Sequence, residues 1–428
     1  MYHDRHLAAA PRVDPRPVSA VSHGCGLAGL AGLVAWLAVA RAFGMAGPLS
    51  ALTALAATAL PMVVWSLLVD RVHRNPSTGI DWSLRRPLRE TLDTSLVKLA
   101  GLWATWAVVA LIYGTGRFYW DGNFAFAMAC FTWGAVPLFA LSIPYLLWLD
   151  RHLIEPRDET WAFGAWLTGT APLDREAVAN HARAWGVKAF FLAFMLAIVP
   201  GGFGDFVRAD LSAASPAQLA SWLITGMFIV DVMVATVGYL LTLRPLDAHI
   251  RSANPYAAAW VAALVCYPPF SLMDDGMPLD YGVGNWREDS WQHWFAAHPL
   301  LLGGAAAVLV VLTAIYAWST VSFGMRFSNL TNRGILTHGP YAWSRHPAYL
   351  SKNLFWWIGA MPWFTTGSAV DAARATLLLA CVSGVYYWRA RTEERHLMAD
   401  AAYAEYWQWM ERNGLVPRVF RWLRGATI

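Results

Sequence analysis

The sequence is poor in charge. Asp, Glu, Lys and Arg make up 14% of its 428 residues, whereas hydrophobic residues make up 57%. A soluble globular domain carries about 25% charged residues. The apolar residues gather in runs of roughly 18 to 25, each long enough to cross about 30 Å of hydrocarbon as a helix. This pattern excludes an ordinary soluble protein and predicts an all-α, polytopic integral membrane bundle.

Cysteine is also scarce. The chain has four cysteines, and all of them lie inside apolar runs. They are Cys25, Cys130, Cys266 and Cys381. Thiols in such runs are typically buried, so the sequence predicts neither a disulfide framework nor a cysteine-based metal site. The formal net charge of +4 is mild and does not favour nucleic acid as a partner.

Tryptophan, by contrast, is abundant. The chain has 25 tryptophans, and this side chain favours the headgroup level of a bilayer. The apolar runs predict about ten transmembrane helices. Their ranges are roughly 25–45, 50–69, 97–114, 124–148, 187–205, 219–243, 256–273, 299–323, 349–366 and 371–390.

Basic residues are concentrated in every second loop. The basic segments are 70–98, 149–187, 244–255, 324–348 and the tail after residue 390, whereas the loop at 274–298 is acidic. Loops rich in Lys and Arg stay in the cytoplasm. The alternation therefore predicts that both termini and the loop at 324–348 face the cytosol, with the chain in a membrane such as the bacterial inner membrane.

The sequence predicts a division near residue 295. Residues 1–24 are expected to form a disordered cytosolic N-terminus. Residues 25–295 are expected to form a transmembrane block of about seven spans. Residues 296–428 hold the last spans, the polar motifs described next, and a tail with a cytosolic helix.

A polar loop with two proline turns lies between two of the last spans. Its turns are Gly339-Pro340-Tyr341 and Arg345-His346-Pro347-Ala348-Tyr349. Proline fixes φ and interrupts a helix, so Pro347 is expected in the first turn of the helix that re-enters the membrane. Tyr349 is then expected to point inward. A plain interface turn explains Arg345 and Tyr341, but it explains His346 and Tyr349 less well.

An acidic pair, Glu393-Glu394, follows where the last span leaves the membrane. A carboxylate there can bind the ribose hydroxyls of a nucleoside or the amino group of an amino-acid moiety. The alternative is a solvated charged helix in which Arg389 pairs along the same face. The tail at 398–420 contains several aromatic residues and is expected to be an amphipathic helix that closes a pocket or simply anchors the chain.

The region from about Phe327 to Phe420 resembles a family of integral-membrane methyltransferases, the isoprenylcysteine carboxyl methyltransferases and their bacterial phospholipid N-methyltransferase relatives. The shared pattern is a Gly-Pro-Tyr turn, an Arg-His-Pro-x-Tyr turn, a helical hairpin, a Glu-Glu pair, and a tail with spaced tyrosines before a proline. In this chain the pattern comprises Gly339-Pro340-Tyr341, Arg345-His346-Pro347, Tyr349, Glu393-Glu394, Tyr403, Tyr406 and Pro417.

The resemblance implies an enzyme that transfers a methyl group from S-adenosylmethionine to a lipid-borne acceptor, which carries an isoprenoid, a carboxylate or an amine. It implies Arg345 and Glu394 as catalytic residues, with Arg345 on the acceptor side. The residues implied to bind the cofactor are Tyr341, His346, Pro347, Tyr349, Glu393 and Glu394.

Four residues are further candidates for substrate binding. Many relatives have a glycine where this chain has Ser351, and the Lys352 and Asn353 that follow are expected to narrow the pocket or contact the substrate. Trp356 offers an aromatic face that suits a cationic sulfonium. Asp231 lies near the middle of the span at 219–243, where a carboxylate is costly unless it is paired. It is either functional or hydrogen-bonded to a neighbouring helix.

Two other functions stay open on the sequence. Membrane sterol reductases, which bind a nicotinamide cofactor, look similar over the final hairpin and tail, although the Arg345-His346-Pro347 turn favours the methyltransferases. A transporter or assembly protein is the non-enzymatic alternative, and Asp231 and the large N-terminal block favour it. Histidines 338, 346 and 396 lack the spacing of metal ligands, so no metal site is predicted.

Overall fold

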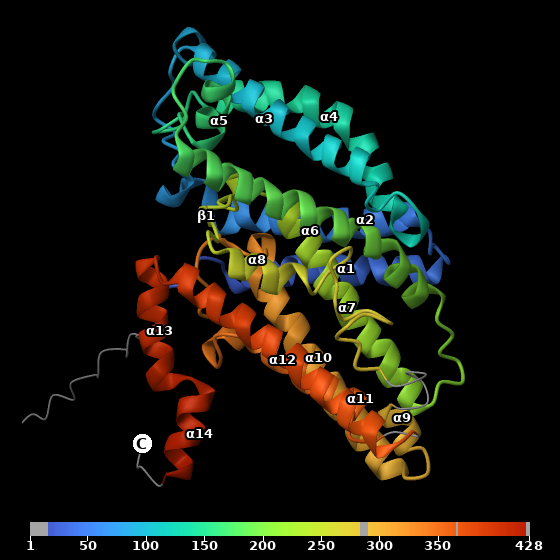
Figure 1. Cartoon of the computed structure of the whole chain (residues 1–428). Helices are drawn as coiled ribbons and strands as arrows, with labels where there is room; N and C mark the ends of the chain where they lie inside the picture. Colours follow the sequence, from blue (N-terminus) through green and yellow to red (C-terminus); the bar gives the residue numbers. More distant parts are fainter. Residues whose placement is uncertain (1–15, 283–289, 365–366, 425–428) are drawn as a thin grey trace, which may run out of the picture.

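The computed structural model describes residues 16–282, 290–364 and 367–424. Over these residues the chain is mostly helical, and its one two-stranded sheet pairs β1 (Ser252–Ala253) with β2 (Thr331–Asn332). The long helices run side by side, with α3 and α4 at one edge of the bundle and α10, α11 and α12 at the other (Figure 1). The prediction of an all-α, polytopic membrane bundle is confirmed.

Eight helices in the described residues are long and apolar enough to cross a membrane. They are α1 (His23–Ala42), α2 (Pro48–Val64) with η1 (Trp65–Val69), α3 (Leu88–Gly116), α4 (Ala125–Leu149), α6 (Arg175–Arg208), α7 (Pro216–Leu240), α10 (Pro299–Phe323) with η6 (Gly324–Arg326), and α12 (Ala369–Leu397). The starts of two of them follow sequence signals, because Ser215 and Ser368 form capping boxes at α7 and α12.

Two of the ten expected spans are shorter than the apolar runs suggest. The run at 256–273 contains only α8 (Ala257–Leu264), and the run at 349–366 contains α11 (Pro347–Ala360). A helix of about 20 residues is needed to span the hydrocarbon. α8 ends before the pair Pro268-Pro269, and α11 ends at Ala360, followed by its C-cap Met361 with a φ of 45° and by Pro362. Proline cannot continue either helix, so apolar composition overstates its length.

The short helices α5 (Glu159–Leu167) and α9 (Trp291–Trp294) lie in connections between the long ones. The C-terminal tail forms α13 (Ala401–Asn413) and α14 (Leu415–Leu423). α13 follows α12 at the end of the bundle that carries β1, and α14 continues from it (Figure 1). The tail is thus two helices with a break at Gly414, where a single amphipathic helix was expected.

The N-terminal segment differs from the expected disordered 1–24. Residues 1–15 lie outside the described residues. From Arg16 to Ser22 the chain packs against the polar loop of the C-terminal region, and the backbone N–H of Ala20 donates to the carbonyl of Ile335 at 2.8 Å. Ser22 then caps α1, which begins at His23. Long-range contacts that composition does not reveal hold this segment in place.

Buried arginines join the two halves of the chain at this end of the bundle. Arg333 is 2% exposed and donates to the carbonyl oxygens of Gly238 and Phe327, each at 2.8 Å. Its Nε also donates to the carbonyl of Ala248 at 2.8 Å. One guanidinium thus satisfies backbone acceptors at the end of α7 and in the loop after α10, and this fixes where the polar loop begins.

Candidate active site

The Gly339-Pro340-Tyr341 turn is a short 3-10 helix, η7 (Gly339–Ala342). Gly339 has a φ of 58°, and a Cβ there would lie 2.6 Å from the Ser322 hydroxyl oxygen, so the turn requires glycine. It places Tyr341 on the wall of a cavity between α10, α11 and α12. Burial raises the pKa of the Tyr341 hydroxyl well above its ordinary value, so the phenol is neutral.

The Arg-His-Pro-x-Tyr turn leads directly into α11. Pro347 occupies the first helical position, as the sequence predicts, and His346 precedes it as the N-cap residue. The rings of His346 and Tyr349 stack with centroids 5.5 Å apart and planes 4° from parallel. Both side chains line the cavity. The proline start of α11 therefore aims two predicted site residues at the same space.

Glu394 ties the polar loop to α12. Its Oε1 accepts from Arg345 Nε at 2.8 Å and lies 3.2 Å from His346 Nε2, while its Oε2 accepts from Arg391 at 2.6 Å. The side chain of Glu394 is 7% exposed. Both oxygens are thus engaged with cationic or ring donors. In this arrangement Glu394 orients Arg345 and His346 from behind the cavity wall.

α13 covers the polar loop from the outside. Arg345 also donates to Glu411 of α13 at 2.7 Å, and its guanidinium lies 5.3 Å from the ring centre of Trp407. The hydroxyl of Tyr406 donates to the carbonyl of Tyr341 at 2.7 Å. Arg345 therefore joins the loop, α12 and α13, and the tail closes over the site.

The cavity has a volume of about 80 Å³. Six of the residues predicted for the site line it: Tyr341, Arg345, His346, Tyr349, Lys352 and Glu393. Glu393 reaches it from α12, where its Oε2 accepts from the hydroxyl of Tyr349 at 3.0 Å. Residues far apart in sequence thus meet around one polar space.

The other predicted site residues lie outside the cavity wall. Pro347 is buried as the first residue of α11, and Glu394 lies behind Arg345. Asn353 donates its amide to the carbonyl of Tyr349 at 2.8 Å, which ties it to its own helix. Trp356 packs edge-on against Tyr386 with centroids 5.1 Å apart. Trp356 therefore contacts Tyr386 and Lys352, which line the cavity, but does not line it itself among the described residues.

Lys352 is held by aromatic faces. Its ammonium lies 5.1 Å from the ring centre of Trp356, 5.4 Å from that of Tyr316 and 5.7 Å from that of Tyr386. Aromatic faces attract a cation by their negative quadrupole. Aromatic faces therefore stabilise the positive charge of Lys352 in this part of the site.

Asp231 contacts the site through two hydroxyls. Tyr316 donates to one carboxylate oxygen at 2.8 Å, and Thr320 donates to the other at 2.5 Å. Both donors are on α10 and both line the cavity. The expected hydrogen bond to a neighbouring helix is therefore present. It also links the N-terminal block to the site, because Asp231 belongs to α7.

Replacing Asp231 with leucine is expected to lower the free energy of unfolding by about 2 to 4 kcal/mol, because the hydroxyls of Tyr316 and Thr320 each lose a buried acceptor. Asp231→Asn keeps one acceptor oxygen and is expected to cost less. Chemical unfolding in detergent measures both. Asp205→Asn is the control, since its side chain is 76% exposed. Wild-type stability for Asp231→Leu would contradict this role.

Some residues around the cavity were not predicted for the site. Arg389 is 5% exposed, and its guanidinium lies 5.3 Å from the ring centre of Tyr349 and 5.2 Å from that of Tyr386. Tyr386, Arg389 and Glu393 recur at helical spacing on one face of α12, which is a signal that the sequence contains. Tyr316 and Thr320 carry no such signal, because only the packing of α10 brings them to the cavity.

Comparison with known proteins agrees with this geometry. The sequence model of the isoprenylcysteine carboxyl methyltransferase (ICMT) family matches residues 296–399. The match begins just before α10 and ends just after α12, so it contains every residue named above on the cavity wall. No curated protein and no solved structure matches the chain. Neither the sterol-reductase nor the transporter alternative gains support.

The match and the cavity thus fall in the same part of the chain. The family implies a membrane methyltransferase, and the long apolar helices provide the membrane part. Residues 296–399, in the C-terminal part of a chain whose described residues include eight helices able to span a membrane, thus match the isoprenylcysteine carboxyl methyltransferase family.

Proposed function

We propose that this protein transfers a methyl group from S-adenosylmethionine to a lipid-borne acceptor at the cytoplasmic face of the membrane. The observation that carries the proposal is the convergence of Tyr341, His346, Tyr349 and Glu393 on one cavity inside the family region. These side chains come from the polar loop, α11 and α12.

The chemistry of the cavity wall suits this cofactor. Glu393 has one carboxylate oxygen held by Tyr349, and its second oxygen suits ribose hydroxyls or an ammonium group. Tyr349 and Tyr386 present aromatic faces that already hold the guanidinium of Arg389, so they suit a sulfonium as well. A bound S-adenosylmethionine supplies an activated methyl group.

The volume of the cavity sets a condition on binding. Sites for drug-sized ligands occupy about 300 to 1,000 Å³, whereas this cavity has about 80 Å³. Cofactor entry therefore requires the wall to move. We expect α13, which packs on Arg345 of this wall, to release the wall when it moves, because the Glu411 side chain in its ion pair with Arg345 is 47% exposed and exposed ion pairs are weak.

The acceptor reaches the site from the bilayer in this proposal. α11 turns apolar side chains outward, with Leu350 44% and Leu354 43% exposed, and such faces suit lipid. Arg345 stands beside the cavity, where it can orient an anionic acceptor, while an amine acceptor needs a carboxylate such as Glu393 to take its proton. The protein otherwise aligns the reacting atoms and excludes water.

The N-terminal block contributes to the acceptor side in this proposal. Asp231 of α7 accepts hydrogen bonds from Tyr316 and Thr320, which line the cavity. This link suggests that residues 25–295 help to form the acceptor side of the site. The basic loops favour a cytosolic polar loop in a membrane such as the bacterial inner membrane. The site then faces the cytosol, where soluble S-adenosylmethionine is available.

Calorimetric titration of the detergent-purified protein with S-adenosylmethionine tests the proposal. We expect saturable binding, weakened about ten- to a hundredfold in His346→Ala, because that change removes the ring stacked on Tyr349 and a partner of Glu394. His298→Ala is the control, since His298 is exposed and its side chain makes no capping bond. NADPH is titrated in parallel. Binding of NADPH alone, or equal S-adenosylmethionine binding by both variants, would refute the proposal.

A further inference from the structure

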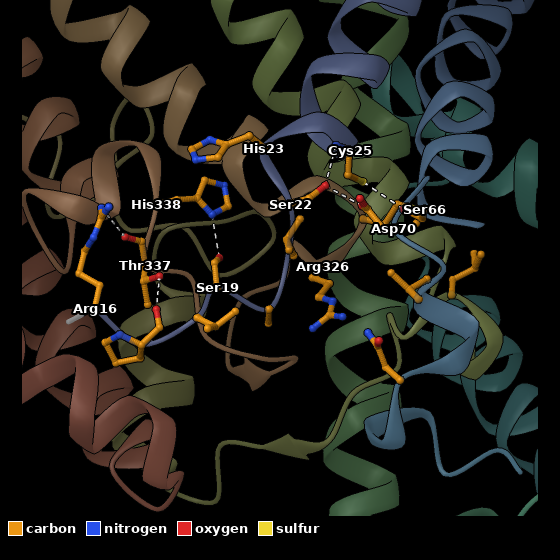
Figure 2. Close-up of a pocket in the computed structure, with 18 residues that line it drawn as sticks. Arg16, Ser19, Ser22, His23, Cys25, Ser66, Asp70, Arg326, Thr337 and His338 are labelled. Carbon is orange, nitrogen blue, oxygen red and sulfur yellow. Dashed lines mark hydrogen bonds between the residues drawn. The ribbon is translucent and has the colours of Figure 1, made fainter. Parts of the chain in front are cut away.

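A second polar cavity lies on the other side of the polar loop. It has a volume of about 660 Å³ and is bounded by the N-terminal segment 16–22, the start of α1, the end of η1 and the residues just before the Gly-Pro-Tyr turn. Figure 2 shows His338 between Ser19 and His23 on one side of this cavity and Asp70 on the other. None of its lining residues belongs to the wall of the candidate active site.

The N-terminal segment and the polar loop build this cavity together. The hydroxyl of Thr337 donates to the carbonyl of Pro17 at 2.7 Å, and the Ser19 hydroxyl lies 2.7 Å from His338 Nδ1. Together with the bond from Ala20 to Ile335, these contacts fix the position of the loop. Hydrogen bonds between the N-terminal segment and the polar loop therefore define this wall of the cavity.

His338 lines the cavity and has a ring nitrogen without a hydrogen-bond partner among the described residues. The residue is 7% exposed, and this nitrogen is its Nε2, which is buried. Burial lowers the pKa of His338 to about 4, so the ring is neutral near pH 7. The Ser19 hydroxyl can donate to Nδ1, which leaves the ring proton on Nε2. A buried donor of this kind is costly unless a ligand accepts from it.

The surroundings of this donor are electropositive. The guanidinium of Arg16 and that of Arg326 are on the lining, and the imidazole of His23 lies 4.0 Å from that of His338, centroid to centroid. The 20-residue helix α1 also begins here, with Ser22 accepting from the N–H of Cys25. The N–H groups that begin a helix favour an anion.

Two carboxylates near the cavity offset part of this positive potential. Asp70 is the one acidic residue on the lining among the described residues, and its oxygens accept from Ser22 at 2.6 Å and from Trp65 at 3.2 Å. Asp247 lies behind the wall and accepts from Arg326 at 2.7 Å. Because Asp70 bonds the N-cap residue of α1, the negative charge lies at the start of that helix, and the positive side of the cavity is the side of His338 and Arg16.

We propose that this cavity binds a phosphate-bearing anion, which accepts a hydrogen bond from His338 Nε2 and lies on the side of Arg16, away from Asp70. A free phosphate compound and the headgroup of an anionic lipid share this chemistry. Both can reach the site, because it is open and lies where α1 starts.

Calorimetric titration of the detergent-purified full chain with inorganic phosphate, dihexanoyl phosphatidic acid and dihexanoyl phosphatidylcholine tests this site. We expect saturable binding of phosphatidic acid, with or without binding of inorganic phosphate. His338→Ala should weaken it about tenfold or more, and His338→Gln, which keeps a donor, should restore part of the loss. Asp70→Asn should tighten binding a few-fold, because it removes the one negative charge on the lining.

The outcomes separate the sources and the alternatives. Binding of phosphatidic acid alone supports a lipid headgroup, and binding of both anions supports a general phosphate site. Phosphatidylcholine bound as tightly as phosphatidic acid, no saturable binding of either anion, or affinities unchanged in all three variants would overturn the proposal. The proposal can be tested even if His338→Ala folds poorly, because Asp70→Asn is expected to raise the affinity for the anion, whereas His338→Ala is expected to lower it.

Discussion

Replacing Glu394 with glutamine is expected to weaken S-adenosylmethionine binding by about a hundredfold. The carboxylate accepts from Arg345, His346 and Arg391, and an amide offers one oxygen and no charge. Removing one partner of a fully buried ion pair costs about 3 to 5 kcal/mol. Water reaches Arg345 and Arg391, whose side chains are 22% and 57% exposed, so we expect about 2 to 3 kcal/mol here. Calorimetry measures the binding.

Glu411→Gln is the matched control for this prediction. Glu411 also accepts from Arg345 at 2.7 Å, but its side chain is 47% exposed, so its loss should change affinity by less than about threefold. Thermal unfolding of both variants separates binding from folding. Equal affinities for the two variants would show that Glu394 does not orient the site.

Replacing Lys98 with methionine is expected to lower the free energy of unfolding by about 3 to 5 kcal/mol, because the change leaves two carboxylates without their shared cation. Lys98 lies 2.8 Å from Asp150 and 2.9 Å from Asp158, and the side chains of Lys98 and Asp150 are 1% and 0% exposed. The ion cluster joins α3, the end of α4 and the start of α5. Chemical unfolding in detergent measures the loss.

Two variants show whether the unpaired charges cause that loss. Arg89→Met removes an exposed cation from the same helix and should change the stability little. The double variant Lys98→Met with Asp150→Asn removes one of the stranded charges and should recover part of the stability. If the double variant is less stable than Lys98→Met alone, the loss comes from packing.

Lys98 also shows where sequence patterns mislead. On the sequence it counts among the basic residues of a cytosolic loop at 70–98, because the apolar run begins near residue 97. In the structure α3 begins at Leu88, so Lys98 is inside the helix and buried. Arg333 is a similar case, since it lies in a basic loop yet bonds buried carbonyls. Charge counts locate loops, but they do not reveal which charges are paired.

The site shows the same division. Pro347 and the glycine of the Gly-Pro-Tyr turn act through local geometry, which is why the start of α11 and the inward position of Tyr349 were predictable. Asn353 is a candidate by its place beside Ser351 and Trp356 by its aromatic face, yet contacts within and between the helices hold both away from the cavity wall. Local sequence rules thus predict the positions of the turns, whereas the partners of each side chain become known only from the way the helices pack.

The sequence by itself determined the helical membrane class, the proline turns and the family region, because apolar run length and proline geometry act over a few residues. Only the tertiary structure decided how α13 packs on the polar loop, the partners of Asp231 and the cavity at His338. Each of these depends on contacts between residues far apart in the chain. Such contacts depend on how the helices pack, which no local pattern encodes.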